Sequence, residues 1–289
     1  MKTIVIAGAS GFIGKHVQDF FKSESWQVLT IGRTNSDAVW SDQTSLVKIL
    51  EGADAVVNLA GKSVNCRFTE ANVRELIQSR ISTTRAIGEA LGKCERPPAV
   101  WINASGASIY REHVSQANTE SSPTDGEGTM AEVARQWEHA FFTSVTPSTR
   151  KIALRISLVI GRDGGVLPIY LRLARLGLGG KQGSGRQMMS WIHIDDLVQL
   201  VASLVQSTSF SGVVNAAAPE SLTNSDFMRT IRESVSMPIG FPAPTIAIRL
   251  GTFLIGASHE LVLRGMWVQS EVAETLDFSY RYKIFRRSI

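Results

Sequence analysis

Three glycines near the start of the chain are spaced for contact with a phosphate. Gly8, Gly11 and Gly14 form a GxxGxxG pattern between a β-branched run and a stretch of helical period. Gly8 permits a tight turn, Gly11 lets backbone amides approach a pyrophosphate, and Gly14 lets the helix pack on the strand. The positive end of the helix dipole adds to this site. The pattern predicts a dinucleotide-binding loop, with a glycine-rich turn that binds nothing as the alternative; the expected contacts are Gly8, Ser10, Gly11, Phe12, Ile13 and Gly14.

A basic residue stands where the adenosine ribose of such a cofactor would be recognised. The chain reads IGRTNS at this point, and Arg33 occupies the place at which NAD-selective domains carry a carboxylate. A carboxylate would repel a 2′-phosphate, whereas a guanidinium would hold it. We therefore expect NADP(H) to be preferred over NAD(H). The alternative is an Arg33 that is only exposed to solvent.

Hydroxyl groups gather in the segment NASGASIY, directly after a predicted strand. Ser105, Ser108 and Tyr110 would lie where substrate and nicotinamide meet, and we predict these three as the catalytic residues. The alternative is that the tyrosine is a wall residue and the serines only satisfy backbone groups at a turn.

Tyr110 needs a cation if it is to transfer a proton. An ordinary tyrosine has a pKa near 10 and is a poor acid or base at neutral pH. No lysine follows it at four residues. Lys62 and Arg80 are the cations that we expect near its hydroxyl.

The elements that must position these residues alternate between strand and helix up to about residue 216. Such an order predicts an α/β fold of the Rossmann type, a doubly wound parallel sheet with helices on both faces. We expect strands at 3–7, 27–31, 54–59, 99–103, 151–159 and 213–216, with a short one near 38–40, and helices near 13–24, 44–51, 70–92, 129–143 and 195–206.

The later part of the chain has a different texture, with eight glycines between 161 and 191 and four prolines between 219 and 244. We expect a nucleotide-binding domain over 1–160 that also takes in about 187–216. Residues 161–186 and 217–289 would form a small α/β substrate lobe over the carboxyl ends of the strands, where open α/β sheets bind ligands.

One polar segment, HIDDL, looks reactive but is better explained by structure. We read His193 as the end of a strand and one of the two aspartates after it as the cap of a helix. Adjacent carboxylates at a helix start cannot flank one glycosidic bond. Trp137 and Glu138 are expected to pack and pair structurally, and no metal-ligand pattern is present.

Composition indicates an ordinary globular protein of 289 residues with a net charge of +4. The basic residues are scattered, so a nucleic-acid partner is not expected. Two cysteines without a CxxC pattern and a start that reads as a strand point to the cytoplasm. No apolar stretch reaches the roughly twenty residues of a membrane span, so a membrane partner is not expected.

Three further segments carry a family resemblance: NLAG at 58–61, GSGRQMMSWIHIDDL at 183–197 and VNAAAPESLTNSDF at 214–227. With the glycine loop, they make the chain resemble the extended short-chain dehydrogenases/reductases. It is most similar to the atypical sugar-nucleotide epimerase-like subgroup of the NAD-dependent epimerase/dehydratase superfamily. The resemblance implies a Rossmann domain with a C-terminal substrate lobe, and a homodimer through helices 70–92 and 129–143. It also implies further cofactor contacts at Leu59, Ala60, Gly61 and Arg80.

The same resemblance shows what the chain lacks. Working members use a Ser and a Tyr-x-x-x-Lys, and these positions fall on Gly106, Met130 and Ala134. The position of the arginine that binds the diphosphate of a nucleotide sugar falls on Met189, and Arg186 is the alternative for this role. We therefore do not expect a nucleotide-diphosphate sugar as substrate.

Two functions remain open at this level. The first is an NADP(H)-binding oxidoreductase or epimerase-like enzyme for a small carbonyl or hydroxyl compound, with an atypical site. The second is a catalytically silent NADP(H) sensor or scaffold protein.

Overall fold

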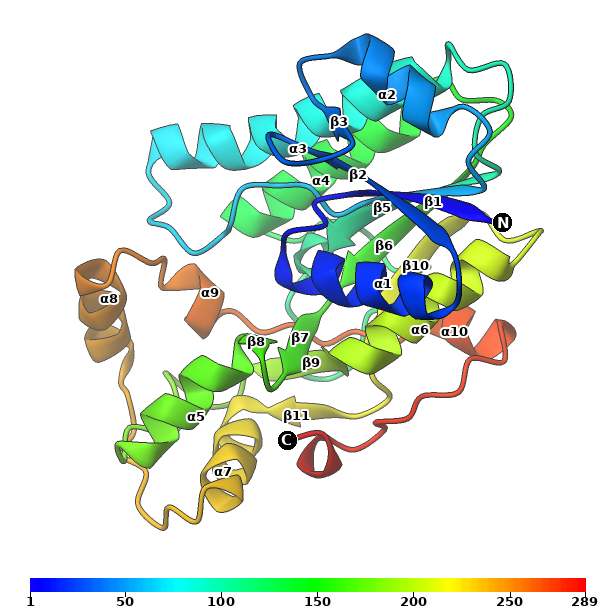
Figure 1. Cartoon of the computed structure of the whole chain (residues 1–289). Helices are drawn as coiled ribbons and strands as arrows, with labels where there is room; N and C mark the ends of the chain where they lie inside the picture. Colours follow the sequence, from blue (N-terminus) through cyan, green and yellow to red (C-terminus); the bar gives the residue numbers. More distant parts are fainter.

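The computed structural model describes residues 1–289 and contains two sheets (Figure 1). The larger sheet has seven strands, all parallel to their neighbours, in the order β10-β6-β5-β4-β1-β2-β3. The predicted doubly wound Rossmann fold is therefore confirmed. The strands are β1 (Thr3–Ala7), β2 (Gln27–Gly32), β3 (Ala38–Val39), β4 (Ala55–Asn58), β5 (Val100–Gly106), β6 (Arg150–Ile156) and β10 (Gly212–Ala216).

Helices cover both faces of this sheet because successive strand residues point to opposite sides. Ile4 and Ile6 of β1 join the core beneath α1 (Phe12–Ser23) and α6 (Ile194–Gln206). Val5 and Ala7 join the core on the other face, beneath three helices that lie together above the sheet in Figure 1. Those helices are α2 (Gln43–Leu50), α3 (Glu70–Leu91) and α4 (Thr129–Phe142).

The smaller sheet has four strands in the order β11-β9-β7-β8. It packs with α5 (Leu167–Arg175) and α7 (Asn224–Ser234) around a separate core that includes Trp191, Phe227 and Phe285. Its strands are β7 (Leu158–Gly161), β8 (Gly164–Gly165), β9 (Met188–His193) and β11 (Ser221–Thr223). The other helices of this part are α8 (Thr245–Leu254), α9 (Glu260–Leu263) and α10 (Glu271–Thr275).

The strand predicted at 151–159 is two strands, which corrects the prediction. Ser157 separates β6 from β7, and its N–H and hydroxyl both donate to the Ala216 carbonyl, at 3.1 and 2.7 Å. β6 pairs with β5 and β10, while β7 leaves that sheet and pairs with β9. The small sheet therefore begins at Leu158 and takes in β9, whereas the sequence prediction groups these residues with the nucleotide-binding part. The division into two separate domains stays a prediction.

The cap of α6 also differs from the prediction. His193, not an aspartate, caps the helix, because its Nδ1 accepts the N–H of Asp195 at 3.2 Å. The buried Asp196 instead accepts the N–H groups of Arg281 and Tyr282 at 2.8 and 2.9 Å. This carboxylate fixes the C-terminal segment against α6. None of the helices combines the length and the apolar content needed to cross a bilayer.

Candidate functional site

The glycine loop between β1 and α1 adopts a turn that other residues would obstruct. Gly8 has a φ of +81°, and a Cβ on it would lie 2.8 Å from the Leu59 carbonyl. A Cβ on Gly14 would lie 2.2 Å from the Gly8 oxygen. The helix therefore starts directly against the turn and beside the residues that follow β4, which is the geometry that the three glycines predicted.

The start of α1 is suited to an anion. Its N-cap is Gly11, no side chain caps the helix, and its first turn carries no acidic residue. The first N–H groups of a helix have no partner within the helix, so these donors face outward together with the positive dipole end. Phe12 contributes only backbone here, because its ring packs on the β7–β8 turn, where a Cβ on Gly164 would meet it at 2.4 Å. Ser10 is exposed and Ile13 half-buried.

The loop after β2 presents Arg33 to solvent without an ion-pair partner. Thr34 and Asn35 beside it are also exposed, and Asn35 adopts a left-handed φ of 51°. The nearest carboxylate in the chain, Asp37, is bound by the N–H and hydroxyl of Thr30, both at 2.8 Å. Arg33 is thus a charged side chain of this loop that has no ion-pair partner.

Beyond β4, a buried amide network holds the NLAG segment in place. Asn58 donates to the Oδ1 of Asn103 at 2.7 Å and accepts the N–H of Ala60 at 3.1 Å. Thr84 of α3 accepts from Asn58 and from the indole N–H of Trp137 on α4, at 3.2 and 3.0 Å. Two strands and two helices are therefore tied together at the start of this loop, which leads to the predicted contacts Leu59, Ala60 and Gly61.

Arg80 lies directly beneath this loop. A Cβ on Gly61 would come within 3.1 Å of the Arg80 Cζ. The guanidinium lies 5.0 Å from the centre of the Trp137 ring and donates to the Leu76 carbonyl at 2.9 Å, but its Nε has no partner. Burial lowers the pKa of Arg80 to about 10. A buried guanidinium without a carboxylate is a group that a bound anion or polar ligand would stabilise.

The hydroxyl groups predicted as catalytic do not all face the same space. Tyr110 is buried, accepts a hydrogen bond from Arg155 at 2.6 Å and donates to Asn215 at 2.9 Å. Ser105 is buried and donates to the Glu138 carboxylate at 2.7 Å. These groups form one network from β5, β6, β10 and α4.

Arg155 is the cation beside Tyr110, which corrects our expectation of Lys62 or Arg80. Lys62 instead contacts Asn72 and Glu75. Burial raises the pKa of Tyr110, and the neighbouring guanidinium only partly offsets that rise. For Arg155, burial alone would lower the pKa, but the hydrogen bonds and charge of the Glu138 carboxylate outweigh burial and raise it. The sequence did contain a signal: Arg155 lies inside an otherwise apolar strand, where a charge needs a partner.

Ser108 is the half-exposed member of the three. Its hydroxyl donates to the Met130 carbonyl at 3.2 Å. A Cβ on Gly106 would lie 3.0 Å from the Ser108 Oγ and 3.9 Å from the Ala134 Cβ. The three positions without reactive side chains, Gly106, Met130 and Ala134, are thus gathered around Ser108.

A carboxylate from the small lobe also reaches this place. Glu260 of α9 accepts the N–H groups of Thr129 and Met130, at 3.2 and 3.0 Å. Favourable charge at a helix start explains the contact, but no sequence pattern identified it. Met189 is buried and bridges to Met266, while Arg186 is exposed and has no ion-pair partner. Met189 itself thus offers no cation, and Arg186 stays the alternative for that role.

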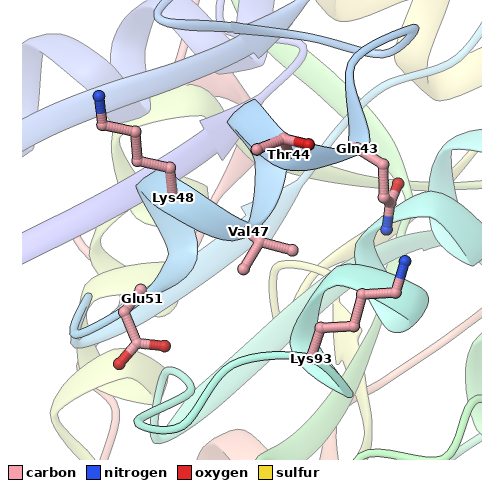
Figure 2. Close-up of a pocket in the computed structure, with 6 residues that line it drawn as sticks. All are labelled: Gln43, Thr44, Val47, Lys48, Glu51 and Lys93. Atoms are coloured by element: carbon pink, nitrogen blue, oxygen red, sulfur yellow. The ribbon is translucent and has the colours of Figure 1, made fainter.

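A groove elsewhere on the surface has no connection with this site. Figure 2 shows it between α2 and the end of α3. Both helices end there before leading into the next strand, so the groove lies at the amino edge of the sheet. It is lined by Gln43, Thr44, Val47, Lys48, Glu51 and Lys93.

Comparison with known proteins agrees with this geometry. Residues 4–217 match the model of the NAD dependent epimerase/dehydratase family. The chain belongs to this family. It is similar to epimerase family protein SDR39U1 of Bos taurus, with 32% identity over 286 residues that cover 96% of this chain and 95% of that protein. The chloroplastic SDR39U1 homolog of Arabidopsis thaliana is 29% identical over 301 residues, covering 99% and 85%.

A solved family member has the same fold. The crystal structure of human epimerase family protein SDR39U1 (isoform2) with NADPH has a TM-score of 0.90 and 27% identity, and the match covers 99% of this chain and 97% of that one. The resemblance to extended short-chain dehydrogenases/reductases is thereby confirmed. The individual contact and catalytic residues stay predictions.

Proposed function

We propose that the chain binds NADP(H) and uses it in an oxidoreductase or epimerase-like reaction on a small carbonyl or hydroxyl compound. The observation that carries this proposal is the pair formed by the uncapped start of α1 and the free Arg33. The amides suit a pyrophosphate and the guanidinium suits a 2′-phosphate. The NADPH in the human SDR39U1 structure supports the same cofactor here.

The bound nicotinamide would supply or accept a hydride, and the protein would hold the substrate beside it. We assign substrate contact to Ser108, because among the three predicted hydroxyl groups it is half-exposed while those of Ser105 and Tyr110 are buried. Tyr110 and Ser105 would have a supporting role, since each hydroxyl already donates to a buried partner. The missing cation at Met189 favours a substrate without a diphosphate.

A screen of aldehydes and ketones for NADPH oxidation tests the enzyme proposal. Ser108→Ala should reduce kcat/KM about 10- to 100-fold on any substrate found, because a hydrogen bond to a charged group contributes about 1.5–3 kcal/mol. Ser203→Ala is the matched control, because Ser203 also donates to a main-chain carbonyl but lies on α6. Equal activity of Ser108→Ala and wild type would remove Ser108 from the proposal.

A catalytically silent NADP(H) sensor is the second candidate. The specific observation in its favour is that the Ser, Tyr and Lys of working family members are all missing, and that Gly106, Met130 and Ala134 stand in their places. Tight NADPH binding with no turnover across the screen, and a protein partner retained only with cofactor, would favour this candidate over the enzyme.

A further inference from the structure

The small lobe exposes an unusual amount of apolar surface. Only Ile248 and Thr252 of α8 are buried, so the helix shows most of its side chains to solvent. The exposed fraction is 81% for Ile246 and 72% for Leu254. Ile246, Leu250 and Leu254 recur at every fourth residue and so lie along one face of α8, and an exposed apolar face of this kind marks an interaction site in soluble proteins. The exposed apolar members are Leu176, Leu178, Ile239, Phe241, Ile246, Leu250, Phe253, Leu254 and Ile255.

These residues belong to two segments that are bonded to each other. The N–H of Phe241 donates to the Gly177 carbonyl at 2.8 Å, and that of Ala243 donates to Lys181 at 2.9 Å. The end of α5 is therefore joined to the segment that leads into α8. Both helices lie on the left of the small lobe in Figure 1. We call this region, residues 172–186 with 237–255, the α5/α8 surface.

The charges on the α5/α8 surface have one sign. No Asp or Glu occurs between residues 164 and 194 or between 234 and 259. The nearest acidic groups in sequence are already engaged, Glu233 with Arg286 and Glu260 with the start of α4. The exposed cations that form no ion pair are Arg172, Arg175, Lys181, Arg186 and Arg249.

This charge pattern decides which partner fits. A two-fold contact between copies would bring two surfaces of the same positive charge together, which is unfavourable. An anionic lipid surface offers both phosphates for the cations and acyl chains for the apolar side chains. A membrane-spanning segment is not needed, because a short helix with exposed apolar groups can lie in the interface plane.

We propose that the α5/α8 surface docks the protein peripherally on an anionic membrane surface. Ile246, Leu254 and Ile255 enter the acyl boundary, and Arg172, Arg175 and Arg249 contact the lipid phosphates. The proposal does not use the proposed cofactor contacts, although α8 meets the loop after β4 through Arg67, which donates to the Phe253 carbonyl at 2.6 Å.

Flotation of the full chain with vesicles tests this docking. The protein should float with vesicles of equal parts phosphatidylcholine and phosphatidylglycerol but not with phosphatidylcholine alone. The floated fraction should fall when NaCl rises from about 0.05 to about 0.5 M, because salt screens the attraction. Ile246→Ser/Leu254→Ser should lower the apparent affinity for vesicles at least about tenfold.

Matched variants make the result decisive. Val145→Ser removes an equally exposed apolar side chain (81%) after α4 and should leave flotation unchanged. Arg172→Gln/Arg175→Gln should reduce flotation, whereas Lys48→Gln/Lys93→Gln, which also removes two charges, should reduce it much less. Absence of flotation, equal loss in all variants, or a dimer in solution that Ile246→Ser/Leu254→Ser dissociates would overturn the proposal.

Discussion

Replacing Arg155 by methionine is expected to destabilise the protein strongly. The guanidinium makes two 2.7 Å bonds to the Glu138 carboxylate and a third, of 2.6 Å, to the Tyr110 hydroxyl. The exposed fractions are 4% for Arg155 and 7% for Glu138, so the carboxylate left behind cannot regain water. Removing one partner of a buried pair costs about 3–5 kcal/mol.

Urea unfolding followed by the fluorescence of the six tryptophans measures this loss. With a slope of about 3 kcal/mol per molar, typical of a large domain, the midpoint should fall by more than about 1 M. The double variant Glu138→Leu/Arg155→Met should recover much of the loss, because an apolar pair leaves no charge unpaired.

Two results would refute this reasoning. A loss below about 1 kcal/mol in Arg155→Met would place the pair among weak surface ion pairs. A double variant as unstable as the single one would show that packing, and not the unpaired carboxylate, sets the cost.

Three further predictions concern single groups. Gly14→Ala should abolish NADPH binding, because the added Cβ would lie 2.2 Å from the Gly8 oxygen. Gly251→Ala is the control: it has open space around it and should bind NADPH normally in the same fluorescence titration. Burial raises the pKa of Tyr170 to about 12. The neutral Tyr170 side chain therefore contributes its full stability below about pH 10, near the pKa of tyrosine in the unfolded chain, and this contribution is lost as the pH rises from about 10 to about 12. Urea midpoints and tyrosinate absorbance measured over this pH range would follow the loss. Burial, with help from a nearby carboxylate, raises the pKa of Cys94 to about 11, so iodoacetamide should alkylate it more slowly at neutral pH than in the unfolded chain.

The large sheet was predictable because its signals are local. β-branched runs, the glycine loop and helical periods each identify an element without knowledge of distant partners. The break at Ser157 could not be predicted, since KIALRISLV has the pattern of one continuous strand. The strand is divided only because its second half pairs with β9, some thirty residues later in the chain. Periodicity could not give the place of β9 in the small sheet for the same reason.

The candidate site was predictable to a similar degree. The cofactor loop follows from glycine spacing, whereas the assignment of Gly106, Met130 and Ala134 to the missing reactive groups came from the family resemblance and stays a prediction. The cation beside Tyr110 was missed because Arg155 comes from a neighbouring strand that only sheet order brings close. Glu260 was missed because it reaches α4 from a segment 130 residues away, which no local pattern records.

Affinity for the two cofactors tests the central claim most directly. Titration of the wild-type chain should give a Kd for NADPH at least about tenfold below that for NADH, and Arg33→Leu should remove most of this difference, because one charge-assisted contact contributes about 1.5–3 kcal/mol. NADH binding as tight as NADPH binding, or a preference unchanged in Arg33→Leu, would contradict the account.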